Sequence, residues 1–211
     1  MRKTTLIVAA AAWMSLAPAL VLAQPQTAAA RYQDLLGKAK AGGTVDWVAL
    51  RFAYADYADD QGQDLRDRRR KMLTALNASD YAAAKAQAEA IIAAAYVDGE
   101  AHLIESIAER HLNQIADADR EQAVALAVLK SIQTGDGSSQ ATAFTVISVD
   151  EEYELMRARG RQVTQQALVR DGGHAYDVLT TVNESRQPQV FYFQIDRVMA
   201  SESRMFSGKK P

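Results

Sequence analysis

The chain of 211 residues contains no cysteine and only three histidines. Without cysteine no disulfide can form, and no thiolate can act as a nucleophile or a metal ligand. A lipoprotein is excluded as well, because lipid attachment after a signal peptide needs a cysteine. Stability must come from a packed core, and a chain of this length can bury roughly 70% of its unfolded surface.

The chain also lacks a surplus of basic residues. It carries 24 lysines and arginines against 26 aspartates and glutamates. Without Arg2 and Lys3 the basic count falls to 22, which leaves a net charge of −4. Because a general nucleic-acid-binding protein needs a basic face, the sequence predicts no nucleic-acid partner.

Several catalytic and cofactor motifs are absent. The sequence has no HExxH zinc motif, no phosphate-binding P-loop, no dinucleotide fingerprint and no GxSxG hydrolase motif. His102 and His111 lie about 180° apart around one helix, so they cannot share an ion. We therefore predict neither a metal site nor a cofactor.

Residues 1–23 have the pattern of a secretory signal peptide. Arg2 and Lys3 provide a positive start, Leu6 to Leu22 is an almost unbroken apolar run, and small residues precede Gln24. The alternative is an uncleaved anchor, since the run is near the lower limit of ~17–25 residues for a spanning helix. We expect cleavage before Gln24, no stable membrane anchor, and a periplasmic or secreted protein.

The first half of the mature chain has helical periodicity. After a mobile leader, 24–30, helices are expected over 31–41, 65–76, 81–96, 101–112 and 119–132, with another between Thr44 and Tyr57. The run Arg66 to Lys71 is predicted to be a solvated face, the alternative being an anion-binding role. Helices 81–132 resemble tetratricopeptide pairs in Asp80-Tyr81, Ala84, Ala88 and Ile91, but without the exit proline of a regular array.

The period changes from 3.6 to 2 across Ser131–Tyr153, which we name the joint. Its glycine turn is expected to stop the last helix, and Phe144 to Val149 to form a buried strand. A short helix is expected over 150–159. Strands over 162–170, 175–182 and 189–198, joined by two short turns, predict an antiparallel meander.

Together these elements predict an α+β fold. Antiparallel, tetratricopeptide-like helix pairs precede an antiparallel sheet of about four strands with one short helix. One domain is expected over 31–200, with a helical part, 31–132, and a sheet part, 133–200. A polar tail, 201–211, follows.

Five residues are candidates for catalysis: His174, Asp177, Glu151, Glu152 and Asp136. His174 lies beside a tight turn, and the assumed topology brings the carboxylates near it, as an acid/base or metal cluster requires. The alternative is an exposed turn histidine with helix-capping carboxylates. The turn 135–139 can likewise cradle an anion with backbone N–H groups or simply end a helix.

As a set, several short motifs resemble a family of secreted bacterial proteins catalogued only as a domain of unknown function. The joint is the most specific part, and the resemblance covers nearly the whole mature chain. It implies this fold and export, and no activity. The motifs are Leu50-Arg51-Phe52-Ala53-Tyr54, Asp80-Tyr81, Glu100-Ala101-His102, Ser131-Ile132, Gly135-Asp136-Gly137, Ala143-Phe144, Val146-Ile147-Ser148-Val149, Asp150-Glu151-Glu152-Tyr153, Tyr176-Asp177-Val178 and Tyr192-Phe193.

Two functions fit this sequence. The helix pairs and the lack of a complete catalytic constellation favour a non-enzymatic module that binds a protein or peptide. The alternative is a hydrolase-type enzyme that uses a carboxylate/histidine cluster around His174.

Overall fold

The computed structural model describes residues 26–58 and 62–207. The predicted signal peptide, 1–23, lies outside these residues. Helices come first and a four-stranded sheet follows, so the predicted α+β class is confirmed. Within the described ranges, no helix is both long enough and apolar enough to cross a membrane.

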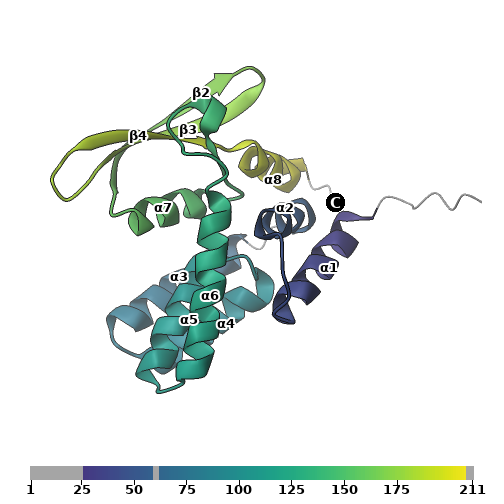
Figure 1. Ribbon diagram of the computed structural model, residues 1–211, viewed down its shortest axis with the longest axis vertical. Helices are drawn as coiled ribbons and strands as arrows, with labels where there is room; N and C mark the ends of the chain where they lie inside the picture. The colour runs from purple at the N-terminus through teal and green to yellow at the C-terminus, as the bar shows by residue number, and fades with distance from the viewer. Residues whose placement is uncertain (1–25, 59–61, 208–211) are drawn as a thin grey trace, which may run out of the picture.

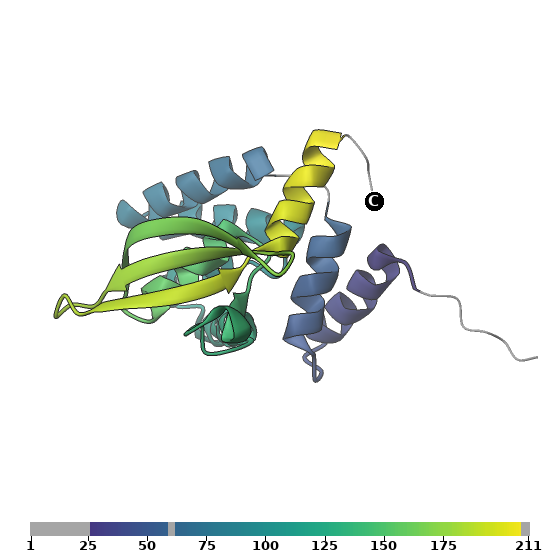
Figure 2. The ribbon, with the colours of Figure 1, turned by 90° about the horizontal axis from the view of Figure 1, so that it is seen from above.

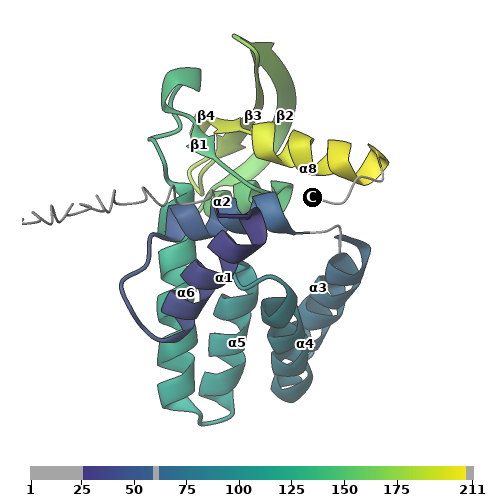
Figure 3. The same cartoon turned by 90° about the vertical axis from the view of Figure 1, so that its right-hand side faces the viewer.

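Aspartate caps organise the helical half. Asp46, Asp80 and Asp98 each accept a hydrogen bond from the backbone N–H three residues on, which satisfies a donor that the helix itself leaves open. The caps begin α2, α4 and α5, and short turns set α3 to α6 side by side (Figure 3). The helices are α1 (Ala28–Lys40), α2 (Trp47–Tyr57), α3 (Gly62–Asn77), α4 (Tyr81–Ala94), α5 (Gly99–His111) and α6 (Ile115–Ile132).

The sheet half contains the predicted meander and one pairing that the sequence did not indicate. Its order is β1-β4-β3-β2, with antiparallel pairing between β2 and β3 and between β3 and β4. The β1–β4 pair is parallel, so the sheet is mixed. Figure 2 shows the strands from above, with α8 at one end. The elements are β1 (Phe144–Thr145), α7 (Val149–Ala158), β2 (Gln162–Asp171), β3 (His174–Val182), β4 (Pro188–Gln194) and α8 (Asp196–Ser207), with a 3₁₀ turn η1 (Gln140–Thr142) before β1.

The joint is partly buried: Asp136 and Val149 are exposed, whereas the start of the predicted strand lies in the core as expected. Phe144 and Val146 are fully buried and share a core with Ile132, Leu155, Leu179, Phe191 and Phe193. Gly137 has a φ of +73°, and a Cβ there would collide with the Phe144 ring. Glycine is therefore required where the joint passes over this ring.

Several predicted boundaries are wrong, and the helix expected over 119–132 already begins at Ile115. Three further differences have an identifiable structural cause. Strand Phe144 to Val149 ends at Thr145, because Ser148 caps α7. The leader is helical from Ala28, because the Thr27 hydroxyl caps α1. The third difference is the C-terminal end of the last strand.

Strand 189–198 ends at Gln194, and 201–207, predicted as tail, belongs to α8. The Asp196 carboxylate accepts a hydrogen bond from the Ala175 N–H at 2.8 Å, which holds the start of α8 against β3. Val198 joins the core, and Arg204 donates to the Ala55 carbonyl at 2.6 Å. These long-range contacts stabilise a helix that its polar sequence alone does not indicate.

Candidate functional site

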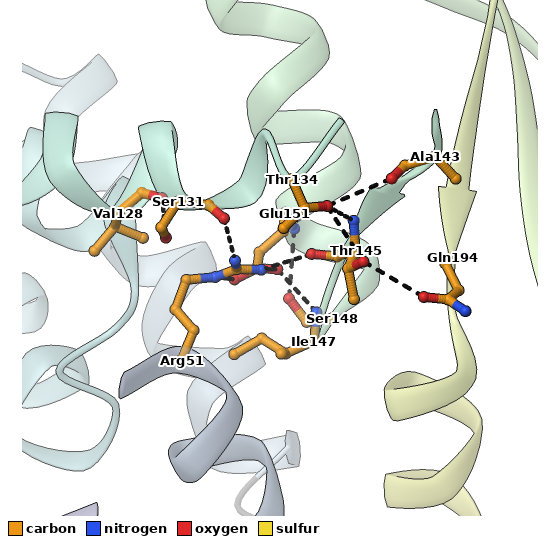
Figure 4. Close-up of polar contacts among 10 residues, drawn as sticks. All are labelled: Arg51, Val128, Ser131, Thr134, Ala143, Thr145, Ile147, Ser148, Glu151 and Gln194. Carbon is orange, nitrogen blue, oxygen red and sulfur yellow. Dashed lines mark hydrogen bonds and ion pairs between the residues drawn. The ribbon is translucent and has the colours of Figure 1, made fainter. Parts of the chain in front are cut away.

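A buried arginine fixes the junction between the two halves. The Arg51 side chain, on α2, is fully buried and donates from Nε to Glu151 Oε1 at 2.8 Å. Its Nη1 donates to the Ser131 carbonyl at 2.8 Å, and its Nη2 to the Thr145 carbonyl at 3.1 Å and to Glu151 Oε2. Figure 4 shows these contacts converging on one guanidinium. Arg51 thus joins α2 to α6, β1 and α7.

Glu151 receives further support from its own segment. Its carboxylate accepts the Ile147 N–H at 2.9 Å, and its N–H donates to the Ser148 hydroxyl at 3.4 Å (Figure 4). The turn before α7 and the first turn of α7 are therefore held rigidly against α2. This turn forms one wall of a pocket.

The pocket has a volume of about 380 Å³ and lies where the helical half meets α7 and α8. We name it the interface pocket. Its lining mixes apolar side chains with charged groups. The apolar lining includes Tyr54, Leu65, Val97, Ile147, Val149 and Val198, and the polar lining includes Arg66, Arg69, Asp98, Glu100, Ser148, Asp150, Glu151, Glu154, Ser201 and Glu202.

Arg69 is the centre of the charged wall. It pairs with Asp98 and Glu100, each at 2.6 Å, and with Asp150 at 3.3 Å. Burial lowers the pKa of Arg69, but the neighbouring carboxylates outweigh that effect and raise it. The predicted solvated face of the Arg66–Lys71 run is wrong for Arg69, whose side chain is only 17% exposed. Three carboxylates from two other helices surround this single cation.

Glu154 adds a further acidic group to the wall. Its carboxyl lies directly against Gly99, where any Cβ would collide with it. Burial, followed by the charges of Asp98 and Glu151, raises the pKa of Glu154 to about 8. Its side chain is therefore mostly protonated at neutral pH, and the pocket becomes more negative as the pH rises through 8.

The five predicted catalytic residues do not form a single cluster. Glu151 pairs with Arg51, and Asp136 accepts hydrogen bonds from the Ser138 N–H at 2.8 Å and the Thr142 hydroxyl at 2.6 Å. The Thr142 and Ser138 bonds lower the pKa of Asp136 to about 2. Asp136 thus closes a turn, as the structural alternative for this segment predicts.

His174 contacts a residue that sequence reasoning missed. Its Nδ1 lies 2.6 Å from Asp196 Oδ2, and the side chain is about half exposed. In the described part of the chain, His174 has no hydrogen bond or ion pair with Asp136, Glu151, Glu152 or Asp177. The structure thus gives no support to a cluster of those residues around His174.

Only Glu152 and Asp177 of the predicted set come together. Glu152 is fully buried beneath the sheet. Within the described residues, neither of its carboxyl oxygens has a hydrogen-bond partner of good geometry. Asp177 accepts from Gln166 Nε2 at 2.6 Å. Burial first, and the Asp177 carboxylate second, raise the pKa of Glu152 to about 9. At neutral pH Glu152 is therefore a buried neutral acid beside a carboxylate.

Histidine and acidic side chains do not converge on a cation site. Across residues 26–58 and 62–207, no three histidine, cysteine, aspartate or glutamate residues are grouped as metal ligands.

Of the residues that line the interface pocket, the sequence indicated Glu151 as a candidate and missed Arg69 and Glu154. The contact between Gly99 and the Glu154 carboxyl joins residues far apart in the chain, so no local sequence pattern indicates it.

Replacing Arg51 by methionine should destabilise the protein by about 3–5 kcal/mol, because it leaves the buried Glu151 carboxylate without its cationic partner. The double variant Arg51→Met, Glu151→Leu should recover most of this loss, since neither charge then remains. Urea denaturation of both variants measures the difference. If the double variant is no more stable than the single one, the ion pair is not the reason for the loss.

Protonation of Glu152 should make stability depend on pH. Its pKa is raised from 4.5 to about 9, so its contribution is complete below 4.5 and is lost as the pH rises towards 9. Glu152→Gln should remove a decline of up to ~1.4 kcal/mol per pH unit in this window. Unfolding free energies at several pH values test this, with Glu89→Gln on exposed α4 surface as the control that keeps the decline. Parallel pH profiles for wild type and Glu152→Gln would show that Glu152 does not titrate in this range.

Comparison with known proteins gives one match. No curated protein and no solved structure matches this chain. A family model described as a domain of unknown function, DUF4919, matches residues 47–204, from the start of α2 into α8. This range contains Arg51, Glu151 and the residues of the interface pocket. The expectation of an uncharacterised family is confirmed, and the chain belongs to the DUF4919 family.

Proposed function

We propose that this protein is an exported, non-enzymatic binding module, and that the interface pocket receives a basic side chain of a protein or peptide. One observation carries the proposal. The lining of the pocket combines apolar side chains with more carboxyl groups than arginines. A lysine or arginine side chain matches both features, because it has an apolar stem and a cationic head.

The dimensions and the charge balance support this assignment. A volume of about 380 Å³ lies within the usual range of ligand pockets, roughly 300–1,000 Å³. Arg69 is already shared among Asp98, Glu100 and Asp150. Glu154 adds a further carboxyl group to the pocket, and this group accepts no hydrogen bond from Arg69. A second cation placed beside Glu154 would favour its ionised form and would be attracted by it.

The pocket offers less support for catalysis. Ser148 caps α7, and Glu151 is held by Arg51, so neither is arranged as a nucleophile or a base. The neighbouring helix pairs, similar in spacing to tetratricopeptide pairs, favour recognition of a peptide. We therefore rank a binding role above the hydrolase alternative.

Export should leave a defined N-terminus. If the positive start and apolar run form a signal peptide, the protein in a periplasmic or secreted fraction begins at Gln24. Intact-mass measurement of the protein after expression with its own N-terminus tests this. Recovery of the full-length chain from the membrane fraction would instead support the uncleaved anchor.

The pocket should distinguish a charged peptide from a neutral one of equal shape. We expect the peptide acetyl-Ala-Leu-Lys-Leu-Ala-amide to bind more tightly than the same peptide with norleucine in place of lysine. Its affinity should rise from pH 7 to pH 9, because Glu154 loses its proton in this range. Isothermal titration calorimetry measures both effects.

Variants locate the binding in the pocket. Glu154→Gln should remove the rise in affinity with pH, and Asp150→Asn should weaken binding several-fold. The matched control Asp117→Asn changes a carboxylate of α6 that is ion-paired with Arg120 and does not line the pocket. Equal affinity for the lysine and norleucine peptides would contradict a cationic ligand. Equal losses in the Asp117 variant would contradict the pocket as the site.

A further inference from the structure

We propose that strand β2 is a homodimerisation edge. In this arrangement β2 pairs antiparallel with β2 of a second copy, about a two-fold axis through Leu168. The two four-stranded sheets would then form one continuous sheet. This proposal concerns a strand that contributes no residue to the interface pocket, and it does not depend on the proposed function.

The position of β2 leaves one of its edges open. It is the last strand in the order β1-β4-β3-β2, and along residues 26–58 and 62–207 no strand pairs with its outer side. It is also ten residues long and largely exposed. An exposed edge of this length presents a row of N–H and C=O groups to another strand.

The turn between β2 and β3 shows which groups face outward. Gly172 and Gly173 have φ values of +57° and +85°, as in a two-residue type I′ hairpin turn, so Asp171 and His174 form the hydrogen-bonded closing pair. Antiparallel pairs alternate between residues that exchange hydrogen bonds and residues that do not. Counting back along β2, the backbone groups of Gln166, Leu168 and Arg170 point away from β3.

The sequence of β2 does not protect this edge. Natural edge strands are commonly blocked by proline, by lysine or by inward-pointing charges. β2 contains neither proline nor lysine, and its two charged residues, Arg170 and Asp171, lie at the turn. Leu168, one of the residues with outward-facing backbone groups, exposes 55% of its surface. An apolar residue at the middle of an open edge favours contact with another chain.

The regular part of β2 is also self-complementary. The pairing with β3 is irregular between Val163 and Gln165, so the regular segment is Gln165–Asp171, whose midpoint is Leu168. In an antiparallel pair centred there, the two Leu168 side chains meet, and Gln166 lies opposite Arg170 of the second copy. All three outward-facing residues then form hydrogen-bonded pairs.

The charges of β2 are compatible with a second copy as the partner strand. In the two-fold arrangement Asp171 lies opposite Gln165 of the second copy, and the two Arg170 side chains lie at opposite ends of the pair. Like charges directly opposite one another would destabilise the pairing, and this arrangement has none. The contact is short compared with stable interfaces, so we expect a dimer that dissociates on dilution.

A single cysteine tests the register directly, because the chain has none of its own. In a hydrogen-bonded antiparallel pair the Cα atoms lie about 5.5 Å apart, but the Cβ atoms are wider apart than an unstrained disulfide allows. Leu168→Cys should therefore give a covalent dimer with a short bis-maleimide cross-linker. Val190→Cys, a similarly exposed apolar position on β4, should remain mainly monomeric. Equal cross-linking of the two variants would overturn the proposed axis.

Charge variants test the dimer without a covalent bond. Size-exclusion chromatography with light scattering should show a concentration-dependent dimer for the wild type. Leu168→Lys and Leu168→Glu should each be monomeric, and an equal mixture of the two should dimerise again. Circular dichroism confirms that the variants are folded. A wild type that is monomeric at every concentration, or a dimer that persists in both variants, would overturn the proposal.

Discussion

The ion pair between Arg51 and Glu151 is the constraint on which the arrangement of the two halves depends. A guanidinium that is fully buried must be paired and hydrogen-bonded, because an isolated charge in the core is strongly unfavourable. Its partners come from α6, β1 and α7, so no single element can satisfy it. The helices and the sheet therefore form one unit around this contact, and α7 is held at a fixed distance from α2.

The position of α7 explains why three nearby glutamates have different environments. Successive residues of a helix point about 100° apart, so Glu151, Glu152 and Glu154 face different neighbours. Glu151 faces Arg51, Glu152 faces the underside of the sheet and Asp177, and Glu154 faces the interface pocket beside Gly99. One short acidic segment thus supplies a structural ion pair, a buried neutral acid and a pocket wall that responds to pH. In this region, environment and not residue type decides what each carboxyl group does.

The features predicted from sequence are those with local causes. The helices expected over 81–96 and 101–112 have local periodicity, and the turn expected between the strands 162–170 and 175–182 is made by the adjacent residues Asp171-Gly172-Gly173. The parallel β1–β4 pair, α8 and the group around Arg69 depend on residues far apart in the chain, so local pattern could not indicate them. Arg51 did carry a signal, since it is the one basic residue in an otherwise mainly apolar α2. Its partner Glu151 was a candidate, but its role proved structural.

The separation of Arg51 and Glu151 along the chain has a consequence for the order of folding. These residues are 100 positions apart, and β1 pairs with β4, a strand that follows it after about 40 residues. As the chain emerges from the ribosome, α2 is complete long before its arginine has all its partners. Until α7 arrives, that face of α2 must stay in water, and β1 has no neighbouring strand until β4 follows. The contacts of Arg51 with β1 and α7 therefore form only when the last third of the chain has been delivered, as contacts of long sequence separation form late and slowly.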